Sequence, residues 1–237
     1  ERFAIEAVGL VDFLTAADGT RKFLCATADG LHVECVLIPA EGDRVTVCVS
    51  TQAGCPMNCA FCRTAGMGLQ RNLTQGEILG QLIVAMRHAA SPVTNVVLMG
   101  MGEPLANAEA VGRAIEVMTA RRAMNLSKRR ITLSTCGLLP ELEAFSRDHD
   151  IKIAISLNAT TDEVRDKLMP INKKYPLAKL MEFCRVYSRD ARHRVTFEYV
   201  LIGGVNDTKE DAKRLVELLK GVRAKVNLIP FNPFDGC

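Results

Sequence analysis

The sequence predicts an α/β protein in which an N-terminal β-hairpin precedes a partial, TIM-like (β/α)6 barrel. Three observations predict this fold. Two alternating segments flank an Asp-Gly pair, strand and helix periodicities then alternate six times, and the unusual polar residues follow the strands. With 237 residues, 48% of them hydrophobic, the chain can bury the core that such a fold needs.

The hairpin is predicted near the N-terminus. Segments 21–28 and 31–38 alternate between apolar and polar residues on either side of Asp29-Gly30, which is a strong signal for a two-residue turn. A turn at these two residues puts Cys25 and Cys35 on opposite faces of the hairpin. We therefore expect these cysteines to form no disulfide with each other.

The hairpin extension is assigned to residues 1–43 and the core to residues 44–237, where strands alternate with amphipathic helices. Two helix starts are marked by Thr74 with Glu77 three residues later, and by Thr208 before two acidic residues. Strands are predicted at 44–50, 95–100, 129–135, 151–157, 195–202 and 225–231, and helices at 74–90, 108–120, 139–148, 161–168, 177–190 and 208–220. Six such units predict a parallel sheet with the helices outside.

Unusual residues follow all six strands. The loops are a cysteine loop, "GMGEP" (100–104), "STCG" (134–137), "SLNA" (156–159), "GGVND" (203–207) and "PFNP" (230–233). Because the carboxyl ends of parallel strands meet at one mouth, we expect one site there. Turn chemistry accounts for the Gly and Pro residues, but it does not account for Glu103, Ser134, Ser156, Asn158 and Asn232 together.

Composition narrows the protein class. No apolar run is long enough to span a membrane and no signal peptide opens the sequence, so a soluble, cytoplasmic protein is expected. The odd number of cysteines, nine, indicates metal or redox chemistry and not a disulfide framework. The net charge of +3 does not by itself demand a nucleic-acid partner, although basic stretches lie at 121–130 and 189–194.

Cys55, Cys59 and Cys62 form a C-x3-C-x2-C loop. Structural zinc sites have four protein ligands, and nothing in the sequence brings His88 or His149 to this loop as the fourth. A four-iron cluster held by three thiolates keeps one iron open, where a substrate or cofactor can bind. The spacing favours such a cluster, and a zinc-stabilised RNA-binding module is the non-catalytic alternative.

These motifs resemble the radical S-adenosylmethionine (SAM) superfamily and, within it, the RlmN/Cfr family of RNA methyltransferases. Phe61 precedes the third cysteine, and the glycine-rich "GMGEP" follows the second core strand. The resemblance extends in order from about residue 20 to 235 through "CVSTQAGCPMNCAFC", "NVVLMGMGEPL", "SKRRITLST", "AISLNA", "MPINKKY", "FEYVLIGGVND" and "NLIPFNPF". It implies a radical SAM partial barrel that binds a [4Fe-4S] cluster and S-adenosylmethionine and methylates carbon 2 of an adenosine in 23S rRNA and tRNA.

The resemblance also implies a mechanism. The adenine carbon is not nucleophilic, so the family first methylates a cysteine, and a 5′-deoxyadenosyl radical then removes hydrogen from that methyl group. The carbon radical adds to the base, and a second cysteine resolves the adduct. Cys48 matches this second cysteine and Glu34 the proton acceptor. Strand alternation alone does not distinguish Cys48 in this role from a small packed residue.

The resemblance also assigns cluster-binding and cofactor-binding roles to individual positions of this sequence. The resemblance assigns the cluster to Cys55, Cys59 and Cys62, and the methionine amino group of the cofactor to Gly102 and Glu103. It assigns the other cofactor contacts to Ser134, Ser156, Leu157, Asn158 and Asn232, although family members often have His in place of Asn158. Four further cysteines are expected to be packed small residues: Cys25, Cys35, Cys136 and Cys184.

The sequence also departs from the family pattern. Family members continue beyond "NPF" and carry the methylated cysteine there, whereas this sequence ends at Cys237, and it lacks their N-terminal RNA domain. We therefore expect a truncated core, with an edge strand that needs covering. Ala53 favours carbon 2, and the alternatives are the carbon 8 antibiotic-resistance reaction or another radical SAM enzyme. The expected partners are the RNA and a reductant such as flavodoxin or ferredoxin, and the protein is expected to be a monomer.

Overall fold

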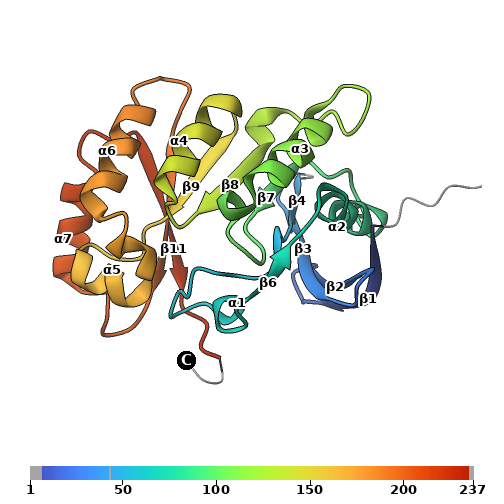
Figure 1. Ribbon diagram of the computed structural model, residues 1–237, viewed down its shortest axis with the longest axis horizontal. Coiled ribbons are helices and arrows are strands. Elements are labelled where there is room, and N and C mark those ends of the chain that lie inside the picture. The colour runs from blue at the N-terminus through green and yellow to red at the C-terminus, as the bar shows by residue number, and fades with distance from the viewer. Residues whose placement is uncertain (1–6, 43, 235–237) are drawn as a thin grey trace, which may run out of the picture.

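The computed structural model describes residues 7–42 and 44–234, which contain an open mixed sheet of nine strands with helices packed along it (Figure 1). The strand order is β1-β2-β3-β4-β7-β8-β9-β10-β11, with β1 and β11 at the two edges. The first four strands are antiparallel: β1 Val8–Thr15, β2 Arg21–Thr27, β3 His32–Ala40 and β4 Arg44–Cys48. The others continue parallel to β4: β7 Asn95–Leu98, β8 Ile131–Thr135, β9 Lys152–Ser156, β10 Val195–Leu201 and β11 Ala224–Pro230.

The six strands and six helices predicted for the core are confirmed, with ends that move by a few residues. The helices are α2 Gln75–Arg87, α3 Ala108–Thr119, α4 Leu139–Asp148, α5 Asp162–Leu168, α6 Leu177–Tyr187 and α7 Lys209–Leu218. Thr74 and Thr208 each form a capping box, with Glu77 and Asp211 respectively, so the predicted helix starts are correct. The short elements β5 Gln52–Gly54, α1 Arg63–Gly66 and β6 Leu69–Asn72 were not predicted.

The predicted register of the hairpin is wrong by one residue. The loop between β2 and β3 has three residues, because Thr27 N–H donates to the Leu31 carbonyl, and Gly30 has φ +82° at the left-handed position that such a loop requires. Cys25 and Cys35 consequently lie on the same buried face, with 0% and 1% exposed, as free thiols. The extra loop residue shifts the pairing of β2 with β3 by one residue. This shift puts the two cysteines on the same face and not on opposite faces.

The N-terminal strands extend the core sheet and do not form a separate layer. Val36 of β3 pairs with Cys48 of β4, and Cys48 in turn pairs with Val97 of β7. The division at residue 43 stays a prediction.

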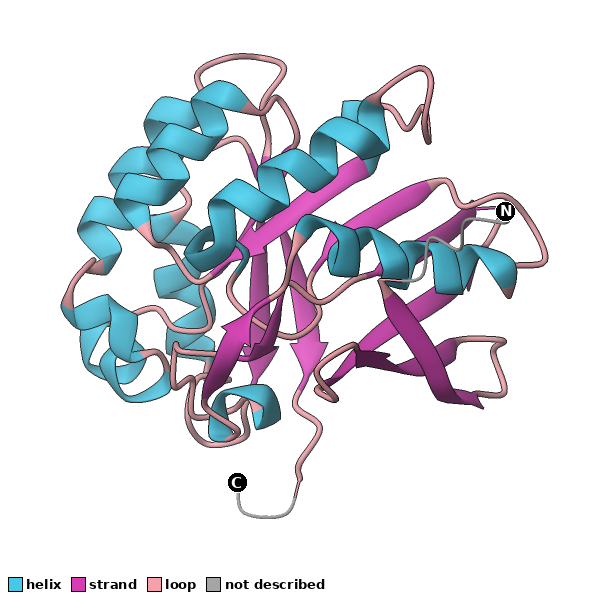
Figure 2. Cartoon of the chain, turned by 45° about the vertical axis from the view of Figure 1, so that its right-hand side comes forward, coloured by secondary structure: helices cyan, strands magenta, loops and turns pink. Residues whose placement is uncertain are grey.

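The two faces of the sheet differ in character. The face toward the helices carries fully buried apolar residues such as Val47, Val96, Leu133, Ile153 and Phe197, and helices of the β/α units cover it (Figure 2). The opposite, concave face carries the alternate positions, which the strand registers align from Cys48 through Val97, Thr132 and Lys152. Among the described residues, every helix is too short or too polar to cross a bilayer.

Candidate functional site

A cavity of about 270 Å³ lies at the carboxyl ends of the parallel strands, where the sequence predicted the site. Eight predicted site residues line it: Cys55, Cys59, Cys62, Gly102, Glu103, Ser134, Ser156 and Asn158. These residues come from loops and strand ends of four chain segments that span more than a hundred positions. Met57, Phe61 and Met169 supply apolar walls.

The cysteine loop is an excursion between two short paired strands. β5 pairs antiparallel with β6, and Cys55 N–H donates to the Gly68 carbonyl at 3.0 Å. Gly54 is required at this closure, because a Cβ there would lie 1.8 Å from the Gly68 carbonyl oxygen. The far side of the loop is held where Ala60 N–H donates to the Leu168 carbonyl at 2.9 Å.

The three thiols are close enough to repel one another when charged. Burial, followed by the nearby Cys62 and Glu103, raises the pKa of the Cys55 thiol to about 11. Burial, followed by Cys62 and Cys55, raises the pKa of the Cys59 thiol to about 12. A cationic group that binds thiolates would relieve this repulsion.

The arrangement does not suit a single metal ion. Within the described residues, no three His, Cys, Asp or Glu side chains converge as one ion would require. The cysteines that hold an iron-sulfur cluster can bind different irons, so their thiolates need not meet at one atom. The loop therefore fits an iron-sulfur cluster better than zinc, and neither His88 nor His149 lines the cavity.

Glu103 is a buried carboxylate that faces the cavity with 3% exposed. One carboxylate oxygen accepts from Cys136 N–H at 2.8 Å and the other from Leu105 N–H at 3.1 Å. Burial raises the pKa of this carboxyl, and these hydrogen bonds oppose the shift. Within the described residues Glu103 has no ion pair, so the geometry suits an ammonium group as ligand.

Backbone and amide hydrogen bonds hold Glu103 and its neighbours against residues 50–52, which follow β4. Glu103 N–H donates to the Gln52 side chain at 2.8 Å, and the Met101 carbonyl accepts from Thr51 N–H at 2.8 Å. Ser50 lies beneath, where its backbone N–H donates to the buried amide of Gln81 at 2.8 Å. The glycine-rich segment is thus held against residues 50–52.

Asn158 has a structural role besides lining the cavity. It adopts φ +56°, a conformation that Asn tolerates better than most residues, and its side-chain oxygen accepts from Val200 N–H at 2.8 Å. Leu157 is fully buried outside the cavity lining, and Asn232 follows β11, exposed and also outside the lining. The cofactor roles of these residues stay predictions.

Arg165 is an important residue that the sequence analysis missed. It is 1% exposed on α5 and donates hydrogen bonds of 2.9–3.0 Å to four acceptors behind the cavity: the carbonyls of Leu157, Cys136 and Ser156, and the side chain of Asn172. Burial lowers the pKa of this guanidinium, and Cys136 and Cys59 oppose the shift. A lone arginine in a helix is usually exposed, so residue type could not reveal it.

Cys48 and Glu34 lie on the concave face, and neither belongs to the cavity lining. Burial raises the pKa of the Cys48 thiol to about 11, although the backbone of Met99, a cavity residue, hydrogen bonds to it and lowers the value. Glu34 is half-exposed and forms an ion pair with Lys22 at 3.0 Å. The structure thus puts both predicted catalytic residues on one face, and their roles stay predictions.

Comparisons with known proteins agree with this geometry. Residues 49–219 match the family model described as the radical SAM superfamily. The chain is 54% identical over 220 residues to the dual-specificity RNA methyltransferase RlmN of Geobacter sulfurreducens, with 93% of this chain and 60% of that protein covered. It is 48% identical to the RlmN of Syntrophobacter fumaroxidans, with 98% and 68% covered.

A solved structure is also similar. The crystal structure of a radical SAM methyltransferase from Sphaerobacter thermophilus superposes with a TM-score of 0.93 at 44% identity, and the match covers 98% of this chain and 69% of that one. The chain thus spans about three fifths of the length of the Geobacter relative.

Proposed function

Because the chain belongs to the radical SAM superfamily and, within it, to the RlmN family of RNA methyltransferases, we propose that it is the catalytic core of an enzyme that methylates carbon 2 of an adenosine in 23S rRNA and tRNA. The observation that carries the proposal is the shared cavity of the three cysteines and the unpaired Glu103 carboxylate. Thiolates and an ammonium-binding carboxylate are the two donor types that a cluster and S-adenosylmethionine need at one site.

Each group has residues in this chain that fit it. Cys55, Cys59 and Cys62 would hold three irons of a [4Fe-4S] cluster, and Glu103 would accept hydrogen bonds from the amino group of S-adenosylmethionine. Ser134 and Ser156 present hydroxyl groups to the same cavity. When bound, the cluster supplies the electron that cleaves S-adenosylmethionine to a 5′-deoxyadenosyl radical.

The chain's own groups would act on the base. Cys48 lies beside Met99 on the concave face of the sheet, which is the face opposite the helices. A thiol there could reach an adenine that approaches this face. With a raised pKa, this thiol stays protonated near neutral pH, so it must lose its proton when it resolves an adduct. The target adenosine must leave its base stack to reach Cys48 and the cavity.

The partners and the cellular location are part of the same proposal. The substrates are ribosomal and transfer RNA, which implies a cytoplasmic enzyme. The electron comes from a reductant protein such as flavodoxin or ferredoxin, and the enzyme acts as a monomer.

Anaerobic reconstitution of the chain tests the cluster and cofactor assignments. Iron and sulfide are measured together with reductive cleavage of S-adenosylmethionine, in the wild type, in Cys55→Ala, and in Cys184→Ala as a control. Cys184 is a buried cysteine of α6, outside the cavity lining. We expect Cys55→Ala to lose the cluster and the cleavage while Cys184→Ala keeps both.

An intact cluster in Cys55→Ala would remove the ligand assignment, and zinc without labile sulfide in the wild type would favour a metal-stabilised RNA-binding module. The substrate is tested by deletion of the full gene, digestion of the RNA and mass spectrometry. Loss of 2-methyladenosine supports the proposed reaction, whereas loss of 8-methyladenosine assigns the carbon 8 reaction.

A further inference from the structure

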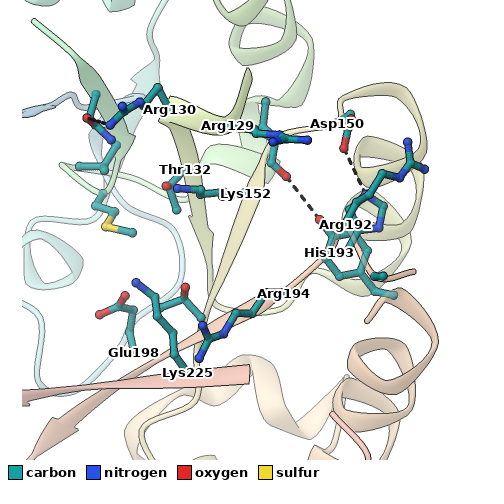
Figure 3. Close-up of a pocket in the computed structure, with 17 residues that line it drawn as sticks. Arg129, Arg130, Thr132, Asp150, Lys152, Arg192, His193, Arg194, Glu198 and Lys225 are labelled. Atoms are coloured by element: carbon teal, nitrogen blue, oxygen red, sulfur yellow. Dashed lines mark hydrogen bonds and ion pairs between the residues drawn. The ribbon is translucent and has the colours of Figure 1, made fainter. Parts of the chain in front are cut away.

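A second and larger hollow, of about 870 Å³, lies on the concave face toward the amino ends of the parallel strands (Figure 3). Residues near the starts of five neighbouring strands line it, including Asn95 of β7, Thr132 of β8, Lys152 of β9, Thr196 of β10 and Lys225 of β11. The proposed reaction uses none of these side chains.

The lining is strongly cationic. Five of its basic residues form no ion pair with any other residue in the described part of the chain: Arg129, Arg130, Lys152, Arg194 and Lys225. Arg130 donates to the Asn95 side chain at 3.3 Å, and Arg194 donates to a backbone carbonyl at 3.0 Å. Partial burial, and then the charges of Lys225 and Arg130, lower the pKa of Lys152 below its ordinary value. These cations therefore repel one another in the absence of an anion.

The carboxylates of the lining do not neutralise this group. Asp150 pairs with His193 at 3.1 Å. Glu198 accepts from the Asn227 side chain at 2.7 Å and lies nearer the catalytic cavity, whose lining it shares. Five unpaired cations thus face two acidic groups, each of which has its own partner.

The hollow adjoins the catalytic cavity, because Met99 and Glu198 line both. Along β9, Lys152 precedes the cavity residue Ser156 by four positions, which is about 13 Å of strand. A few nucleotides of single-stranded RNA can cover such a distance. A base in the cavity would therefore bring the phosphates beside it to these cations.

We propose that this hollow binds phosphate groups of the RNA backbone next to the target adenosine. This inference rests on the proposed function, since it assigns the place where the same RNA lies. Phosphates are the anions that arginine and lysine clusters bind most readily. An acidic partner protein would need a contact area of about 800 Å² on each partner, whereas these cations lie together in one recess.

The test is RNA binding by the cluster-loaded protein, measured by fluorescence anisotropy of a labelled stem-loop RNA with an adenosine in its loop, between about 50 and 200 mM salt. The test variant is Lys152→Ala with Lys225→Ala. The control, Lys167→Ala with Lys179→Ala, removes the same charge from exposed positions of α5 and α6. Lys152→Arg with Lys225→Arg keeps the charge in the hollow.

Loss of two single-strand phosphate contacts reduces the magnitude of the slope of log affinity against log salt by about 1.4. If the two proteins bind equally at about 1 M salt, the test variant binds RNA roughly 25-fold more weakly than the wild type at about 0.1 M salt. We expect this loss in the test variant only, with reductive cleavage of S-adenosylmethionine in the absence of RNA unchanged. Adenosine monophosphate should compete only at concentrations far above those of the RNA.

Equal loss in the test and control variants would overturn the inference, as would a mononucleotide that binds as tightly as the RNA, because the hollow would then be a small-molecule site. A wild type that cleaves the cofactor and binds RNA, combined with an unaffected test variant, would overturn this inference alone. A wild type that neither cleaves the cofactor nor binds RNA would overturn the proposed function as well.

Discussion

Replacement of Arg165 by methionine should strongly destabilise the protein. The guanidinium is 1% exposed and donates four hydrogen bonds, three of them to backbone carbonyls at the ends of β8 and β9. Asn172 links the guanidinium to two carboxylates, since its side-chain amide donates hydrogen bonds to Asp162 at 2.9 Å and to Asp166 at 2.7 Å. Methionine has similar reach but no donor, so Arg165→Met leaves these acceptors without partners.

The stability loss of Arg165→Met is the difference between the hydrogen bonds that are lost and the cost of burying the ion that is relieved. Hydrogen bonds from a charged donor contribute about 1.5–3 kcal/mol each, so four of them give roughly 6–12 kcal/mol. Removal of the arginine also removes the several kcal/mol that it costs to bury the ion. The net loss for a broken buried network is about 3–5 kcal/mol. At about 2–4 °C per kcal/mol for a domain of this size, Tm should fall by roughly 6–20 °C.

Thermal unfolding followed by circular dichroism measures this change, with urea unfolding as a second measurement. The matched control is Arg147→Met, because Arg147 is exposed on α4 and makes no side-chain hydrogen bond among the described residues. We expect the control to stay within about 0.5 kcal/mol of the wild type. A Tm for Arg165→Met within about 2 °C of wild type would refute the reasoning.

Three further substitutions have defined outcomes. Gly100→Ala should destabilise the protein and displace the glycine-rich segment, because a Cβ would lie 2.7 Å from Ser50 Oγ and 2.8 Å from Ser50 N, as thermal unfolding and cofactor titration would detect. Asp211→Asn should lower the free energy of unfolding by about 2 kcal/mol at neutral pH. Burial raises the pKa of the Asp211 carboxyl, but its hydrogen bonds lower the pKa by more, so the pKa falls from 3.8 to about 2. Because the folded pKa is depressed, this contribution is complete above about pH 4 and is lost as the pH falls toward 2, which urea unfolding at several pH values measures. Asn206→Ala should cost about 1–3 kcal/mol in urea unfolding, since its buried amide donates to the carbonyls of Asn158 and Val200, both at 2.8 Å.

Two of these substitutions have a matched control, and each has an outcome that would contradict it. Gly203→Ala adds the same methyl group where nothing lies within 4 Å, so a stability loss equal to that of Gly100→Ala would contradict the steric argument. Asp148→Asn removes an exposed carboxylate of α4 and is the charge-matched control for Asp211→Asn. For Asp211→Asn, a stability difference that stayed constant from pH 7 to 2 would contradict the linkage argument. Wild-type stability in Asn206→Ala would mean that its hydrogen bonds contribute nothing net.

Much of the fold was predictable because its signals are local. The capping boxes at Thr74 and Thr208 lie within four residues, and strand and helix periodicities lie within single elements. The hairpin register was not predictable, because a three-residue loop and a two-residue loop share the Asp-Gly signal and differ only in backbone path. The candidate site was predictable in outline, because parallel strands bring their carboxyl ends to one mouth.

The sequence by itself determined the element order, the cysteine loop and the glycine-rich segment, since each depends on residues close together in the chain. Only the tertiary structure decided that Arg165 is buried behind the cavity, that Asn232 lies outside the cavity lining, and that Lys152 and Lys225 gather with other cations in one hollow. These outcomes depend on strand register and on packing between elements far apart in sequence. A residue's type and neighbours do not specify which distant side chains will share its surroundings.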